Sequence, residues 1–157
     1  MPIVVLRPVG DADLDAIFEQ MSDPVSVQMA AFTAEDPDDR KAFDAHVAMV
    51  MNLPDATLRA VTSDGYLVGT VSSFVLDGVM EVTYWIDRSN WGLGVASRAL
   101  ELLLQEVSQR PLRARVASDN VGSLRVLSKA GFKPVGTEVS YAPARRAEIE
   151  ETLLELT

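Results

Sequence analysis

The chain has 157 residues, of which 48% are hydrophobic and 24% charged, and it carries a net charge of −9. This length and composition predict one folded domain over residues 1–157. The acidic balance argues against binding to nucleic acid, which needs clustered cationic charge. With no cysteine, the chain cannot form disulfides, thiolate metal sites or cysteine nucleophiles, and a cytoplasmic location is the default expectation.

Two further features of the whole chain bear on its partners. There is no basic leader with an apolar run behind it and no stretch of about 18 apolar residues, so we expect neither export nor membrane contact. Residues 88–146 hold ten basic and four acidic residues, whereas the remainder holds four and nineteen. This asymmetry is either ordinary variation in surface charge or the sign of an anion-binding half.

The first elements are a strand and two helices. An apolar run over Ile3–Arg7 predicts a strand that ends at Pro8. A helix then extends to about residue 20, with Asp11 or Asp13 as its cap. A second helix covers about 36–51, with Asp36 as its cap and Pro37 at its first position.

From Thr57 to Asp87 the hydrophobic period changes to two. The turns are Asp64-Gly65 and Asp77-Gly78, dipeptides that supply positive φ in hairpins. This pattern predicts an antiparallel meander with strands at about 57–62, 66–76 and 79–87.

The second half alternates helices and strands. We expect a helix from Val95 that ends before Pro111, a strand over 112–116, a short helix capped by Asp119 or Asn120 and stopped at Gly131, and a strand over 132–141. The last segment, 147–156, is either a strand or a helix, because it has helix-forming residues but is short and uncapped, and we take it as a strand. The predicted class is therefore α+β: a single domain with a mixed, mostly antiparallel central sheet of about six to seven strands, flanked by about four helices.

Two glycines, Gly92 and Gly94, lie just where the helix from Val95 begins, in the run RSNWGLGVASRAL. They form a tight turn, the start of a dinucleotide-binding GxGxxG, or an anion cradle at a helix N-terminus. The dinucleotide motif is disfavoured because Ser97 replaces its third glycine and the preceding strand ends a hairpin meander. In a cradle, glycine lets anion oxygens approach the unpaired N–H groups of the first turn.

Several ordered motifs then carry a resemblance to a known family. The segment 81–136 contains YWI, WGxGxA, an Asn-x-x-Ser helix start and a GF strand, and it resembles the GNAT superfamily of N-acetyltransferases. The order of these motifs is similar to the branch that includes ribosomal-protein N-terminal acetyltransferases, and Leu6-Arg7-Pro8 and the acid-rich first helix also look like that branch's start. The resemblance covers about the whole domain and implies acetyl-CoA as co-substrate, with no metal.

The resemblance also implies a set of residues that bind acetyl-CoA. The strand over 82–86 would lie beside the pantetheine arm, backbone N–H groups from Asn90 to Ala96 would hold the diphosphate, and Asn120 and Ser123 would contact the cofactor from the next helix. The full expected set is Trp85, Ile86, Asp87, Asn90, Trp91, Gly92, Leu93, Gly94, Val95, Ala96, Asn120 and Ser123. Arg88 and Arg125 either add charge toward the phosphates or belong to the solvated surface.

Two residues are candidates for catalysis, by the same resemblance. Glu81 matches a position where related enzymes carry a carboxylate that acts through water as general base, or else it is a solvent-facing hairpin residue. Ser123 is the candidate general acid, or else a helix-packing residue. Many family members carry a tyrosine where this chain has Leu127, which has no proton to donate. His46, the only histidine, is more plausible as a pocket residue than as the base.

The implied function is transfer of an acetyl group from acetyl-CoA to a primary amine by direct attack. The acceptor is a protein N-terminus or a small-molecule amine. Acidic residues are frequent before and at the start of the second predicted helix: Glu35, Asp36, Asp38, Asp39 and Asp44. They either attract a cationic acceptor or form an ordinary solvated surface. The alternative is a non-catalytic acyl-CoA-binding module. A homodimer through an exposed strand is a mild expectation.

Overall fold

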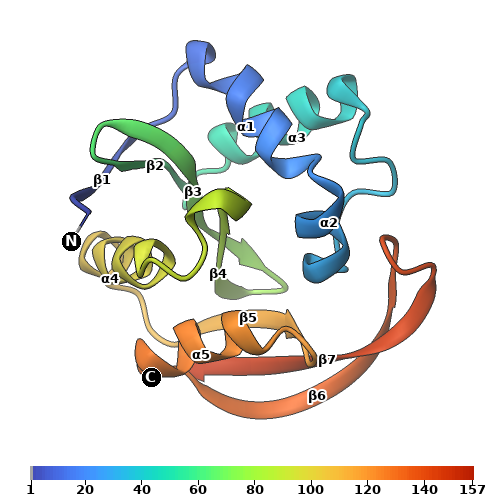
Figure 1. The fold of residues 1–157 in the computed structure, drawn as a ribbon. Coiled ribbons are helices and arrows are strands. Elements are labelled where there is room, and N and C mark those ends of the chain that lie inside the picture. The colour runs from blue at the N-terminus through green and yellow to red at the C-terminus, as the bar shows by residue number, and fades with distance from the viewer. Residues whose placement is uncertain (1) are drawn as a thin grey trace.

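The structure is a computed structural model that describes residues 2–157 (Figure 1). One seven-stranded sheet has the order β1-β2-β3-β4-β5-β7-β6. All neighbouring strands are antiparallel except β4 and β5, which are parallel. The strands are β1 (Val4–Pro8), β2 (Thr57–Ser63), β3 (Tyr66–Leu76), β4 (Val79–Ile86), β5 (Leu112–Ala117), β6 (Lys133–Ala142) and β7 (Ala147–Leu156). The predicted α+β class and mixed sheet are confirmed.

Helices pack on both faces of this sheet. They are α1 (Leu14–Met21), α2 (Pro24–Ala30), α3 (Arg40–Asn52), α4 (Val95–Glu106) and α5 (Val121–Lys129), with short 3-10 turns at Asp11–Asp13 and Arg88–Asn90. Neighbouring residues of β2 show the two layers: Val61 belongs to the large core under α4 and α5, whereas Ala60 belongs to a smaller cluster with α1 and α3. In Figure 1, α1 and α3 lie at the top and α2 lies at the right, whereas α4 and α5 lie at the left and below.

The helix over Pro24–Ala30 is the element that the sequence analysis missed, so the described chain has five α-helices where about four were expected. Its start carries a readable signal, because Asp23 accepts a hydrogen bond from the Ser26 N–H at 3.0 Å and Pro24 occupies the first helical turn. The helix has only seven residues, too short for a clear apolar stripe.

One predicted helix cap is wrong, although the helix itself exists. The α3 cap is Asp39, which accepts from the Ala42 N–H at 3.0 Å. Asp36 instead accepts from the Asp38 N–H, a local turn that competes with helix initiation. At α1, Asp13 does occupy the N-cap position, but its side chain makes no capping hydrogen bond to the helix. The meander, the last three strands and the Asn120 cap of α5 lie within a residue or two of the predicted bounds.

Asp13 ties the end of β1 to the start of the first helices. Its carboxylate accepts two hydrogen bonds from Arg7, at 2.7 and 2.9 Å, and one from the Gly10 N–H at 2.8 Å. Hydrogen bonding from Arg7, then from Gly10, lowers the pKa of Asp13 from 3.8 to about 2. Because the folded-state pKa is the lower one, the ionised form stabilises the fold above about pH 4, and this contribution is lost as the pH falls toward 2.

We therefore expect Asp13→Asn to lower the free energy of unfolding by about 2 kcal/mol at pH 7 and by much less at pH 2. Urea unfolding of both proteins at the two pH values measures this difference. The control is Asp15→Asn, because Asp15 pairs with Arg40 at an exposed site and should contribute less than about 1 kcal/mol. An equal loss at both pH values would contradict the assignment.

Candidate active site

The parallel strands β4 and β5 separate soon after they meet. They are paired only at Met80 with Leu112 and at Glu81 with Arg113. Beyond Glu81, β4 continues to Ile86 paired with β3 alone within the described chain. The backbone groups on its other side are therefore open to a ligand that contributes amide donors and acceptors of its own.

The N-terminus of α4 opens beside this gap. Gly92 and Gly94 have φ of 74° and 78°, and Gly94 is the N-cap residue without a side-chain cap. The first helical hydrogen bond runs from the Arg98 N–H to the Gly94 carbonyl. Within residues 2–157 no protein acceptor is recorded for the N–H groups of residues 95–97. A Cβ built on either glycine meets nothing within 4 Å, so these groups face open space suited to an anion.

The chain between β4 and α4 is held in place by its own side chains. The Trp91 indole donates to the Ile86 carbonyl at 2.8 Å, and Ser89 donates to the Asp87 carboxylate at 2.6 Å. The Trp85 indole donates to the Gln20 carbonyl of α1 at 3.0 Å. These bonds fix the loop that carries the glycines, while Leu93 remains exposed. The residues from Trp85 to Ala96 that were expected to bind acetyl-CoA therefore lie at the end of β4, in the turn after it and in the first turn of α4.

Helix α5 supplies the other two residues of the expected set. The Asn120 side chain caps it by accepting from the Ser123 N–H at 3.2 Å, which leaves the amide NH₂ of Asn120 available to a ligand. The Ser123 hydroxyl lies 2.5 Å from the hydroxyl of Tyr84 on β4. Sequence analysis did not single out Tyr84, although the YWI motif contains it. Burial raises the pKa of the Tyr84 phenol above its ordinary value.

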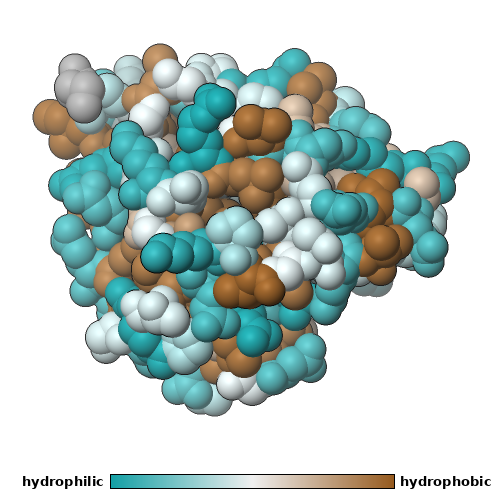
Figure 2. Space-filling model, turned by 90° about the horizontal axis from the view of Figure 1, so that it is seen from below, coloured by the Kyte–Doolittle hydropathy of each residue, from teal (hydrophilic) through white to brown (hydrophobic). Residues whose placement is uncertain are grey.

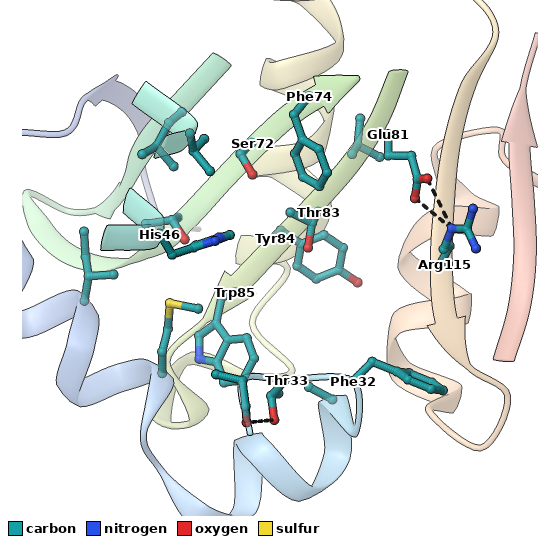
Figure 3. Close-up of a pocket in the computed structure, with 18 of the residues that line it drawn as sticks. Phe32, Thr33, His46, Ser72, Phe74, Glu81, Thr83, Tyr84, Trp85 and Arg115 are labelled. Carbon is teal, nitrogen blue, oxygen red and sulfur yellow. Dashed lines mark hydrogen bonds and ion pairs between the residues drawn. The ribbon is translucent and has the colours of Figure 1, made fainter. Parts of the chain in front are cut away.

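A cavity of about 670 Å³ joins these elements (Figure 3). Apolar side chains of α1 and α3 form one wall, the faces of β3 and β4 form another, and β5 and α5 close the far end. His46 extends from α3 into the cavity (Figure 3), as expected of a pocket residue. Glu81, Tyr84, Asn120, Ser123 and Leu127 all contribute to its lining.

Glu81 is buried, with 5% of its surface exposed, so it is not a solvent-facing hairpin residue. Its two oxygens accept from the Arg115 Nε at 3.1 and 3.2 Å, and Figure 3 shows the two side chains facing each other from β4 and β5. Arg115 also lies 3.4 Å from Glu138 and 3.7 Å from buried Glu151. Burial raises the pKa of Glu151. The guanidinium of Arg115 therefore lies close to three carboxylates.

The two arginines considered for phosphate binding point to different places. Arg88 pairs with Asp23 at the start of α2, at 3.1 Å, so its charge is directed away from the α4 N-terminus. Arg125 is exposed on α5. The groups that face the open space at the start of α4 are therefore backbone N–H groups rather than these two side chains.

Comparisons with known proteins agree with this geometry. A family model described as "Acetyltransferase (GNAT) domain" matches residues 4–133, so the chain belongs to the GNAT acetyltransferase family. The protein named "Probable N-acetyltransferase YjcK" of Bacillus subtilis is 35% identical over 82 residues. That match covers 47% of this chain and 45% of the relative, so the chain spans less than half of the relative's length.

Two solved structures show the same fold over nearly the whole chain. Mycobacterium smegmatis RimJ, in complex with CoA-disulfide, has a TM-score of 0.83 and 21% identity, and covers 100% of this chain and 86% of its own. A phosphinothricin acetyltransferase of Sinorhizobium meliloti, in complex with acetyl-CoA, has a TM-score of 0.83 and 15% identity, and covers 98% of this chain and 87% of its own. Within residues 2–157, no helix combines the length and apolar character of a membrane span.

Proposed function

We propose that this domain, residues 1–157, transfers an acetyl group from acetyl-CoA to a primary amine by direct attack in a ternary complex. The observation that carries the proposal is the open edge of β4 beside the unpaired N–H groups of α4. The edge suits the pantetheine amides, and the helix start suits the diphosphate. Relatives of the same fold were solved with CoA or acetyl-CoA, which supports this choice of co-substrate.

In this proposal the cofactor lies along residues 85–96, with Asn120 and Ser123 on its other side. Gly92, Leu93 and Gly94 contribute backbone N–H groups to the diphosphate site. Those of Asn90 and Trp91, expected there from the sequence, instead donate to the carbonyls of Asp87 and Arg88, at 2.9 and 3.1 Å. Val95 and Ala96 contribute the N–H groups of the first helical turn. The thioester then reaches the gap between β4 and β5, where the cavity from the α1 and α3 side ends.

The reaction forms a C–N bond and breaks the C–S bond of the thioester. The attacking ammonium must lose a proton, and the leaving thiolate must gain one. Glu81 is the proposed base, acting through water, and its hydrogen bonds with Arg115 hold its carboxylate at the cavity wall. The proton that the thiolate takes is proposed to come from the α5 side of the cavity, where Ser123 lies.

The cavity favours a cationic acceptor with an apolar body. Glu81 and Glu151 line its end together with Arg115, and its walls are largely apolar side chains of α1 and α3. Both a peptide N-terminus and a small-molecule amine fit this description. The acceptors named for relatives differ from one another, and we therefore assign none of those acceptors to this protein.

One observation favours the second candidate, a non-catalytic acyl-CoA-binding module. Leu127, buried at 1% exposure, offers no proton where many relatives carry tyrosine. The test is release of free thiol from acetyl-CoA in the presence of peptides, polyamines and aminoglycosides, with acetyl-CoA binding measured by calorimetry. We expect binding and amine-dependent release. Binding without release for every amine would support the module instead.

A further inference from the structure

Leu127 poses a chemical problem at the cavity end formed by α5. The thiolate that leaves acetyl-CoA needs a proton, and Leu127 lines the cavity there without a polar atom. Two hydroxyl groups lie close together at that end, those of Tyr84 and Ser123. Either of them, or the pair acting together, must stand in for a proton donor at position 127.

The geometry of the pair is well defined. Tyr84 comes from β4, beyond the point where β5 separates, and Ser123 comes from the first turn of α5. Their oxygens are 2.5 Å apart. The Tyr84 ring packs against the core under α4, while its hydroxyl end reaches the cavity and points toward β5 (Figure 3). A phenol fixed in this way is held between strand and helix without freedom to swing away.

The acidities of the two groups differ. A phenol titrates near pH 10, about one and a half units above an ordinary thiol, whereas an aliphatic hydroxyl does not titrate in the protein range. The phenol is therefore the stronger acid of the two and the better match to a thiolate. The burial that raises its pKa also keeps it protonated at neutral pH, ready to donate.

We propose that Tyr84 is the proton donor to the leaving thiolate, with Ser123 as its hydrogen-bond partner. As the C–S bond breaks, its electron pair stays on sulfur, and sulfur takes the hydroxyl proton of Tyr84. The Ser123 hydroxyl then donates to the phenolate oxygen. The nitrogen loses two protons, one from the ammonium before attack and one as the amide forms. Solvent receives both and returns one to the phenolate, so the sum is ammonium plus thioester giving amide, thiol and one proton. This step rests on the proposed acetyl transfer.

Tyr84→Phe removes the hydroxyl and keeps the ring. With any amine that the wild-type protein acetylates, we expect kcat to fall at least about 100-fold and the Kd for CoA to stay within about twofold. Ser123→Ala should lower kcat less, and the double variant should be no slower than Tyr84→Phe, because the two groups act as one unit. The matched control is Tyr66→Phe, at an exposed tyrosine far from the cavity, which should change neither quantity.

A second measurement needs no acceptor amine. The absorbance of the thiolate of bound CoA is followed as the pH is raised, for the wild-type protein and for Tyr84→Phe. A hydroxyl that donates to sulfur stabilises the thiolate, so the thiol should ionise about one pH unit lower in the wild-type complex. Equal ionisation together with unchanged kcat would overturn the proposal. A parallel loss of CoA affinity and thermal stability would overturn it too, in favour of a purely structural role.

The two proposals fail in different ways. If the wild-type protein binds CoA but acetylates no amine, the proposed function fails, and the thiol titration still decides whether Tyr84 lies at the sulfur. If amines are acetylated and Tyr84→Phe is as fast as the wild-type protein, only the role of Tyr84 fails.

Discussion

Gly94→Leu is expected to raise the Kd for acetyl-CoA at least about 100-fold, which corresponds to about 2.7 kcal/mol. The new side chain would lie in front of the N–H groups of the first turn of α4, where nothing in the protein now approaches within 4 Å. The diphosphate would then lose charge-assisted hydrogen bonds worth about 1.5–3 kcal/mol each. Calorimetry with acetyl-CoA measures the change, and Gly92→Leu should behave similarly.

The control for this prediction is Gly78→Leu, in the turn between β3 and β4. Gly78 has the same φ of 78° as Gly94 and equally empty surroundings. Both variants therefore carry the same left-handed backbone strain, about 1–2 kcal/mol, and should lose similar stability. Only Gly94→Leu should lose affinity for acetyl-CoA. Equal affinity for acetyl-CoA in the two variants would show that the start of α4 does not bind the diphosphate.

Arg115→Ala is expected to lower the free energy of unfolding by about 3 kcal/mol, since it leaves the buried carboxylates of Glu81 and Glu151 without their cation. Acetyl transfer should fall with it, because Glu81 loses the partner that positions its carboxylate. Urea unfolding and thiol release measure the two effects.

Arg113→Ala is the matched control, two residues earlier on β5. Arg113 pairs with Glu155 at 3.4 Å in a more open setting, so its loss should cost less than about 1 kcal/mol and leave transfer intact. If both arginine variants lost equally little stability and activity, the contacts of Arg115 with its carboxylate partners would have no part in the site.

The elements with local signals are predicted well by the sequence. The hairpins at Gly65 and Gly78 follow from their turn dipeptides, because both glycines adopt positive φ. Helix caps are predicted less well where several aspartates are neighbours. Asp36, Asp38 and Asp39 all precede α3, each of them suits a cap by residue type, and the structure uses Asp39. The seven residues of α2 are too few for periodicity to distinguish them from a loop.

The same division applies to the candidate site. The glycine run and the Asn120 cap depend on neighbouring residues, so motif and spacing are sufficient to find them. The contacts of Glu81 with Arg115 and of Tyr84 with Ser123 join residues 34 and 39 positions apart. The alternation of polar and apolar residues along β4 and β5 does not predict which side chains meet, because it does not indicate where the two parallel strands separate. Those contacts appear only once the sheet is assembled.

A crystal structure of the protein with CoA tests the central claim most directly. We expect diphosphate oxygens about 3 Å from the backbone nitrogens of Val95 and Ala96, and pantetheine amides paired with β4 beyond Glu81. CoA bound with its diphosphate away from the start of α4, or with β4 still free along that edge, would contradict it.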